Sequence, residues 1–190
     1  MAKKLIVLTG LDGSGTSSVA NELHELDLES YLFNSINFPY ANCRDEIDKT
    51  VRDVSPAAHY LFYLSAVAYV SKLIDESLTK GNVYCVRYLI DTVVSHRVAG
   101  LNVGLVYETD FYEIRKPDLT IFLDVDESLR QQRLAVRGKS YLDRTLDNDV
   151  FRLRFLEEFA KLSEHFTKIC ITDKTTVQIA LEIRRLVESL

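Results

Sequence analysis

The sequence has little of what marks secreted, metal-binding or membrane-spanning proteins. It contains three cysteines, three prolines, seven glycines and no tryptophan in 190 residues. The cysteines, Cys43, Cys85 and Cys170, are odd in number and far apart, which argues against a disulfide framework or a zinc site. The longest apolar run, Tyr60 to Val70 with Ser65 inside it, is shorter than the ~20 residues that cross a bilayer. The apolar run after Lys4 is too short for a signal peptide, so we expect a cytoplasmic protein that does not bind membranes.

Acidic residues outnumber basic ones, 28 to 23, and the basic residues are concentrated in one segment. The formal net charge of −5 argues against nonspecific binding to nucleic acid. Between Arg130 and Arg154, however, seven basic residues stand against three acidic ones. Such a segment on an acidic protein predicts a local anion site, with a solvated helix face as the alternative.

The order of apolar segments predicts a single α/β domain over residues 1–190, which is the usual length of one domain. Short runs that are apolar on both faces alternate with amphipathic segments. This pattern is typical of a parallel sheet with helices on both faces. We predict five strands, at residues 4–8, 31–33, 83–86, 118–124 and 169–172. Helices are predicted from Ser17 onward and over residues 44–51, 56–80, 91–99, 126–136 and 148–165, with a last helix through 179–190.

The predicted sheet also indicates where a ligand binds. In open parallel sheets, ligands lie beyond the carboxyl ends of the strands. The segments that follow the predicted strands are therefore the candidates for the site. They are residues 10–18, 34–40, 87–88, 124–126 and 172–173.

The first of these segments nearly matches the phosphate-binding loop G-x-x-x-x-G-K-[ST]. It lies between a strand and a helix, where glycines let the backbone wrap a phosphate and the helix amides bind it. Ser17 is placed to bind Mg²⁺, whereas Thr16 occupies the lysine position. We predict a nucleotide-phosphate site here, with a plain glycine-rich connection as the alternative. The predicted contacts are Gly10, Asp12, Gly13, Ser14, Gly15, Thr16, Ser17 and Ser18.

Six segments, in this order, resemble the thymidylate kinase family over nearly the whole chain. They are Gly10-Leu11-Asp12-Gly13-Ser14-Gly15; Leu61-Phe62-Tyr63; Gly81-Asn82-Val83 to Tyr88, similar to G-x-V-…-D-R-Y; Pro117 to Val125, similar to P-D-L-T-x-x-L-D-V; Arg137-Gly138 with Asp143-Arg144; and Ile171-Thr172-Asp173. The resemblance implies a five-stranded P-loop fold and a homodimer. It also implies transfer of the γ-phosphoryl group of ATP, with Mg²⁺, to dTMP or a near relative.

The resemblance assigns roles to particular residues. It implies a mobile lid at about 137–147 that carries Arg137 and Arg144, which act in catalysis together with Arg87. It places Thr172 and Asp173 beside the adenine of ATP. The acceptor is expected to contact Asp12 through its sugar, together with Phe38, Pro39, Phe62, Arg87 and His96.

Four family side chains are absent. In place of the loop lysine stands Thr16, and in place of the aspartate of D-R-Y stands Val86. Ala66 replaces an arginine that binds thymine in the family, and Leu146 replaces an acidic residue that follows the Asp-Arg pair of the lid. These losses leave two hypotheses open. The chain is either a nucleotide kinase of this type or a weak or inactive nucleotide-binding paralogue with a regulatory role.

Other interpretations of single residues stay open as well. On an apolar helix, Phe62 is a core residue unless it stacks on a base, and His96 is an exposed helical residue unless it contacts one. Arg87 could form a surface ion pair, the charged segment after Arg137 could be an ordinary surface loop, and Asp126 is expected to cap a helix.

Two related activities are disfavoured by the sequence. The segment Asn37-Phe38-Pro39 lacks the carboxylate that a nucleoside kinase of related fold would use to activate a hydroxyl group. The segment Thr172-Asp173-Lys174 does not match the N-K-x-D motif of a GTPase. A monophosphate acceptor needs no strong base, because it is already a nucleophile, so a monophosphate kinase remains the favoured reading.

Overall fold

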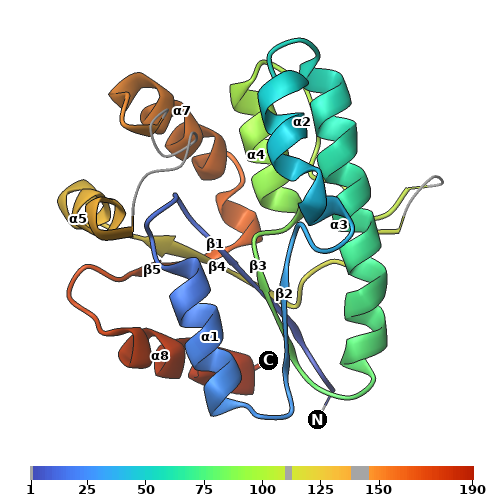
Figure 1. The fold of residues 1–190 in the computed structure, drawn as a ribbon. Coiled ribbons are helices and arrows are strands. Elements are labelled where there is room, and N and C mark those ends of the chain that lie inside the picture. Colours follow the sequence, from blue (N-terminus) through green and yellow to red (C-terminus); the bar gives the residue numbers. More distant parts are fainter. Residues whose placement is uncertain (1, 110–112, 138–145) are drawn as a thin grey trace.

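The computed structural model describes residues 2–109, 113–137 and 146–190, with the side chain of Arg137 not included. It contains the predicted sheet of five parallel strands, in the order β2-β3-β1-β4-β5 (Figure 1). The strands are β1 (Leu5–Thr9), β2 (Tyr31–Asn34), β3 (Val83–Val86), β4 (Leu119–Asp124) and β5 (Thr167–Cys170).

The central strand, β1, shows why a continuous apolar run in the sequence predicted a buried strand correctly. All five residues of β1 are buried, and Val7 lies opposite Cys85 of β3 and Thr120 of β4. A strand buried on both faces needs a continuous apolar run, which residues 5–8 provide. Alternate side chains enter two hydrophobic clusters, one on each face of the sheet.

Helices cover both faces, as predicted. One face carries α1 (Thr16–Leu26) and α8 (Thr176–Glu188), and the other carries α3 (Pro56–Leu78), α4 (Leu89–Val98) and α7 (Asp149–Ala160) (Figure 1). The short α2 (Arg44–Thr50) lies beside α3 and α4, and α5 (Glu127–Arg137) follows β4 (Figure 1). The Ser55-Pro56 start signal is confirmed, because the hydroxyl of Ser55 accepts a hydrogen bond from the amide of Ala58 at 3.2 Å.

Several predicted boundaries were wrong, and α4 begins at Leu89 rather than at Asp91. The long helix ends at Leu78 rather than Lys80, and α7 ends at Ala160, before a 3₁₀ turn at Ser163–His165. The last strand is Thr167–Cys170, two residues earlier than predicted. Because β5 is an edge strand and mostly exposed, its position follows from backbone pairing with β4 and not from an apolar run.

Of the described helices, α3 has the length and mean hydropathy, 1.2, of a candidate membrane span. Its inner face packs on the sheet through the fully buried Val67, Val70 and Ile74. Core helices commonly share this composition, so the observation is weak support for a membrane span.

Candidate functional site

The loop between β1 and α1 is built around three glycines with positive φ. The φ angles are 148° at Gly10, 88° at Gly13 and 91° at Gly15, a region that other residues rarely adopt. At Gly13, a Cβ would also lie 3.0 Å from side-chain carbons of Arg130 and Leu134 on α5. The loop leads directly into α1, with Gly15 as its N-cap. Backbone amides and the positive end of the helix dipole therefore converge here, which favours an anion.

The hydroxyl side chains of the loop differ in their surroundings. Ser17 and Ser18 are exposed on the first turn of α1, and the hydroxyl of Ser17 is an oxygen ligand of the kind that Mg²⁺ prefers. Thr16, in the lysine position, is buried. Ser14 is fully buried and its amide donates to the carbonyl of Leu11 at 3.0 Å, so this residue shapes the loop. Its predicted contact with a nucleotide stays a prediction.

Two arginines of α5 hold the loop from outside. Arg130 is fully buried, donates to the carbonyl of Asp12 at 3.1 Å and binds both carboxylate oxygens of Glu127 at 2.7 Å. Burial opposes its charge, but Glu127 outweighs burial and raises the pKa of the guanidinium. Arg133 donates to the carbonyl of Ser14 at 3.2 Å. Two residues of the basic segment that was predicted to bind an anion thus contact the loop between β1 and α1, although no sequence motif distinguished them.

Arg87 lies at the mouth of the loop, held by two carboxylates. It donates to Asp12 at 2.7 Å, to Asp91 at 2.7 Å and to the carbonyl of Gly10. Burial lowers the pKa of Arg87, but the charges of Asp91 and Asp12 more than compensate and raise it. The residue therefore stays a cation, and its ion pairs lie at the predicted site and not on an unrelated surface.

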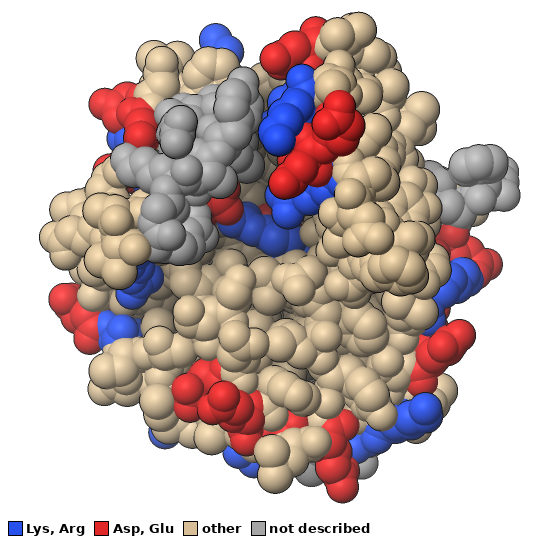
Figure 2. All heavy atoms as spheres, viewed as in Figure 1, with Lys and Arg blue, Asp and Glu red and all other residues tan. Residues whose placement is uncertain are grey.

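A cavity of about 980 Å³ opens beside Arg87. Its lining comes from the loop, the ends of β2 and β3, α2, the first turns of α3 and α4, and α7. Figure 2 shows this hollow with basic side chains at its floor and mixed charges at its rim. The cavity lies at the carboxyl ends of the strands, where the sequence predicted a ligand.

One wall of the cavity is a hydrogen-bonded chain across three helices. Asp48 of α2 accepts from the hydroxyl of Tyr63 at 2.8 Å and lies 2.8 Å from Nε2 of His59, both on α3. Nδ1 of His59 lies 2.8 Å from Nε2 of His96 on α4. Burial opposes the charge of Asp48, but its hydrogen bonds with His59 and Tyr63 and the charge of Arg52 lower its pKa well below the ordinary value. Burial, together with nearby Asp48, raises the pKa of Tyr63 to about 12, so its hydroxyl stays a donor.

This chain of hydrogen bonds predicts a loss of stability in mild acid. Burial, with the charge of His59 adding to it, lowers the pKa of His96 from 6.5 to about 4. The unfolded chain therefore takes up the proton first, and the free energy of unfolding falls as the pH drops from 6.5 toward 4. Thermal or urea unfolding at pH 7 and pH 5 should show a loss on the order of 1–2 kcal/mol from this group.

The variant His96→Gln should lose much less stability over the same interval. His24→Gln, on the remote helix α1, is the control and should behave like the parent protein. An equal loss in His96→Gln and in the parent would show that another group causes the acid sensitivity.

The predicted acceptor contacts occupy different surroundings. Phe38 is 71% exposed and joined to Pro39 by a cis peptide bond. Phe62 is half-buried against Tyr40 and Tyr63, with ring centroids 5.6 and 5.5 Å apart. The cavity is lined by Tyr63 of α3 and by Phe155 and Phe159 of α7, whereas Phe62 is not among its lining residues. The interpretation of His96 as an exposed helical residue was wrong: it is 2% exposed and lies behind His59.

The cavity also has polar lining that no sequence motif singled out. Thr92 and Ser95, on one face of α4, line it together with His59 and Asp48. Their signal in the sequence was weak, because single polar residues on a helix usually face solvent. Only the packing of α2 and α4 beside α3 brings them to one cavity.

Of the other residues singled out in the sequence, some lie near β5 and α5, and the residues of the predicted lid lie mostly outside the described residues. The lid residues 138–145, which include Arg144, and the side chain of Arg137 are outside the described residues. Leu146, at the departure from the family pattern, is buried in the core and lines the cavity. Thr172 follows β5, and its hydroxyl accepts from the amide of Asp126 at 3.3 Å. The backbone amide of Arg130 donates to the carbonyl of Asp126 at 2.9 Å, so Asp126 directly precedes α5, and capping of α5 by its side chain stays a prediction.

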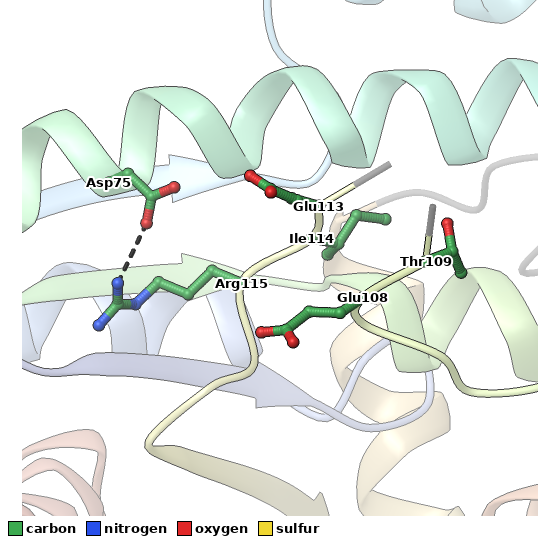
Figure 3. Close-up of a pocket in the computed structure, with 6 residues that line it drawn as sticks. All are labelled: Asp75, Glu108, Thr109, Glu113, Ile114 and Arg115. Atoms are coloured by element: carbon green, nitrogen blue, oxygen red, sulfur yellow. Dashed lines mark hydrogen bonds and ion pairs between the residues drawn. The ribbon is translucent and has the colours of Figure 1, made fainter. Parts of the chain in front are cut away.

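A second cavity, of about 610 Å³, lies away from this site, between α3 and the segment that leads into β4 (Figure 3). It is lined mainly by charged side chains, and Arg115 donates to Asp75 at 3.1 Å across it. Within residues 2–109, 113–137 and 146–190, no cluster of His, Cys, Asp and Glu suits a metal ion. Of these two cavities, the first adjoins the glycine-rich loop between β1 and α1.

Comparison with known proteins gives a consistent result. The sequence model of the thymidylate kinase family matches residues 8–184. A probable thymidylate kinase of Methanococcus vannielii is 26% identical over 171 residues, which cover 85% of this chain and 78% of the relative. A probable thymidylate kinase of Archaeoglobus fulgidus is 25% identical over 189 residues, which cover 97% and 95% of the two chains.

Solved structures share the fold. The thymidylate kinase of Candida albicans superposes with a TM-score of 0.75 at 18% identity, covering 99% of this chain and 92% of that one. A deoxyadenosine kinase from M. mycoides superposes with a TM-score of 0.65 at 14% identity, covering 98% and 100%. The fold expected from the resemblance is therefore confirmed.

Proposed function

The chain belongs to the thymidylate kinase family, and from this premise we propose that it transfers the γ-phosphoryl group of ATP to a pyrimidine deoxynucleoside monophosphate, dTMP or a near relative. Members of this family are ATP-dependent nucleoside monophosphate kinases. The observation that carries the proposal is the position of Arg87, which joins the phosphate-binding loop to the adjoining cavity.

We propose that the loop and α5 bind ATP. The amides around Gly13 and Gly15 would hold the phosphates, with Arg133 adding positive charge beside them. Magnesium prefers oxygen ligands and usually takes most of them from water and substrate phosphates. The exposed hydroxyl of Ser17 fits such a site, in which the metal would neutralise phosphate charge.

The monophosphate would lie in the cavity, with its phosphate at Arg87. An oxygen of that phosphate attacks the γ-phosphorus of ATP, the bond from this phosphorus to the β-phosphate oxygen breaks, and ADP leaves. The chain supplies little covalent chemistry. Its residues align the two nucleotides and neutralise charge, which are the main requirements of phosphoryl transfer.

The base pocket is expected to discriminate weakly among pyrimidines. Ala66 stands where the family has a thymine-binding arginine, and it is buried at 1% exposure. A site without such a hydrogen-bond donor discriminates weakly. We expect similar dissociation constants for dTMP, dUMP and dCMP in parallel calorimetric titrations. A 100-fold preference for dTMP would show that other residues, with Thr92 and Ser95 as first candidates, recognise the base.

Calorimetry also tests the proposal itself. Titration with ATP and with a nonhydrolysable analogue, both with Mg²⁺, should give saturable heat. Folded protein that gives none up to millimolar nucleotide would remove both the kinase proposal and the second candidate, a nucleotide-binding paralogue without turnover. That second candidate is favoured only by Thr16 and Val86.

We also propose a homodimer. The outer face of α3 exposes apolar side chains, with Leu61 at 61% and Tyr69 at 39% exposure. Sedimentation velocity should show a mass near twice 21.7 kDa. The protein is expected to act in the cytoplasm without nucleic acid or a membrane as partner.

A further inference from the structure

Asp91 connects three elements at the carboxyl ends of the strands. Its Oδ1 accepts from the hydroxyl of Thr9 at 2.7 Å and from Arg87 at 2.7 Å, and its Oδ2 accepts from the amide of Tyr88 at 3.0 Å. Thr9 ends β1 immediately before the loop, and Tyr88 is the N-cap of α4. One carboxylate therefore ties the loop, the end of β3 and the start of α4 together.

The backbone of Arg87 needs such support. Its φ of 66° makes it the one described residue other than glycine with a positive φ. Non-glycine residues stay in this conformation only where their surroundings hold them. The guanidinium of Arg87 donates hydrogen bonds of 2.7 Å to the carboxylate of Asp12, on the loop, and to the carboxylate of Asp91, on α4.

Asp91 also brings a carboxylate near the place where the family pattern has an aspartate that this chain lacks. The resemblance places an aspartate at position 86, but Val86 is 7% exposed and packs in the cluster on the α1 and α8 face. Asp91 brings a carboxylate to the same end of β1 and β3 from the opposite face of the sheet. Its side chain lines the cavity beside Arg87.

We infer that Asp91 is a positioning residue for phosphoryl transfer, which holds Arg87 where it binds the phosphate of the acceptor and supplies a carboxylate at the strand ends that Val86 lacks. The inference rests on the proposed function. A guanidinium has five N–H donors, of which the described residues use three, and the rest can bind phosphate oxygens. Without Asp91 the guanidinium would keep Asp12 but lose its second support.

A double-mutant cycle tests this inference. Asp91→Asn removes the charge that pairs with Arg87 and keeps one acceptor oxygen, which can bind either the hydroxyl of Thr9 or the amide of Tyr88. We expect the calorimetric dissociation constant for dTMP to rise roughly 10-fold, with ATP binding unchanged. In an Arg87→Gln background, Asp91→Asn should have no further effect on dTMP binding, because the residue acts through Arg87.

The matched control is Asp75→Asn, which breaks a comparable pair with Arg115 at 3.1 Å in the remote cavity (Figure 3). It should leave dTMP binding unchanged. If Asp91→Asn does not fold, Asp91→Ser, which also suits the start of a helix, takes its place.

Several outcomes would overturn the inference. These are unchanged dTMP binding in Asp91→Asn, effects that add in the double variant, and equal weakening of ATP and dTMP. Parent protein that binds ATP but no monophosphate would overturn the proposed function itself. If the parent protein binds both ATP and dTMP, the double-mutant cycle tests the role of Asp91 separately from the proposed function.

Discussion

Arg87→Gln is expected to lower kcat/KM for the monophosphate by roughly 10²–10³-fold. Arg87 is the cation common to the loop and the cavity, since it bonds to Gly10 and Asp12 and lines the cavity. Glutamine can donate a hydrogen bond but carries no charge to neutralise the phosphates that must approach one another. The variant also leaves Asp12 and Asp91 without their shared cation, which adds repulsion toward any phosphate.

Steady-state kinetics with ATP and dTMP varied separately measures this effect. Arg115→Gln is the control, because Arg115 is also paired with a carboxylate but lies in the second cavity. It should keep the activity of the parent protein. Arg87→Gln with parent-like kcat/KM would show that Arg87 has only a structural role and that another cation binds the acceptor.

Thr16→Lys is expected to raise kcat roughly 10- to 100-fold and to tighten ATP binding. A lysine here would place an ammonium beside the β- and γ-phosphates, where negative charge is spread in the transition state. The glycines that let the loop wrap a phosphate are already in place. Thr16→Met, with a long uncharged side chain, is the control and should not raise kcat.

Cations near the loop decide how much Thr16→Lys can restore. Arg133 on α5 already donates to Ser14, and Arg137 ends the same helix. Comparison with Arg133→Gln and Arg137→Ala therefore separates three cases. A gain in Thr16→Lys indicates a site weakened by the missing lysine. No gain, with loss in an arginine variant, indicates a relocated cation. No change in all three, with ATP bound, would indicate a protein that binds nucleotide without turnover.

The parts of the fold that the sequence predicted well are those determined by local chemistry. Residues 5–8 must be a buried strand because they are apolar on both faces, and Ser55-Pro56 can start a helix without distant contacts. The glycines of the loop were recognisable for the same reason. In contrast, the predicted position of β5 was wrong by two residues, because an edge strand is positioned by its pairing with the neighbouring strand β4.

Only part of the candidate functional site could be predicted from the sequence. The loop and Arg87 follow strands directly, so their place at one edge of the sheet could be deduced. Asp91 and Arg130 act through side-chain contacts to residues 82 and 118 positions away, which no local pattern records. From the sequence, Phe62 was predicted to stack on the base of the acceptor. In the structure, Tyr63 of α3 lines the cavity and Phe62 packs against Tyr40.

The most direct test of the account is to identify the products of the parent protein. The protein is incubated with ATP, Mg²⁺ and dTMP, and the nucleotides are separated by chromatography and identified by phosphorus NMR. We expect ADP and dTDP to form in equal amounts, dTDP to require both substrates, and Arg87→Gln to slow the formation of both products together. If folded protein binds ATP and dTMP but forms no dTDP, or forms ADP without a diphosphate of the acceptor, the chain does not carry out the proposed transfer to dTMP.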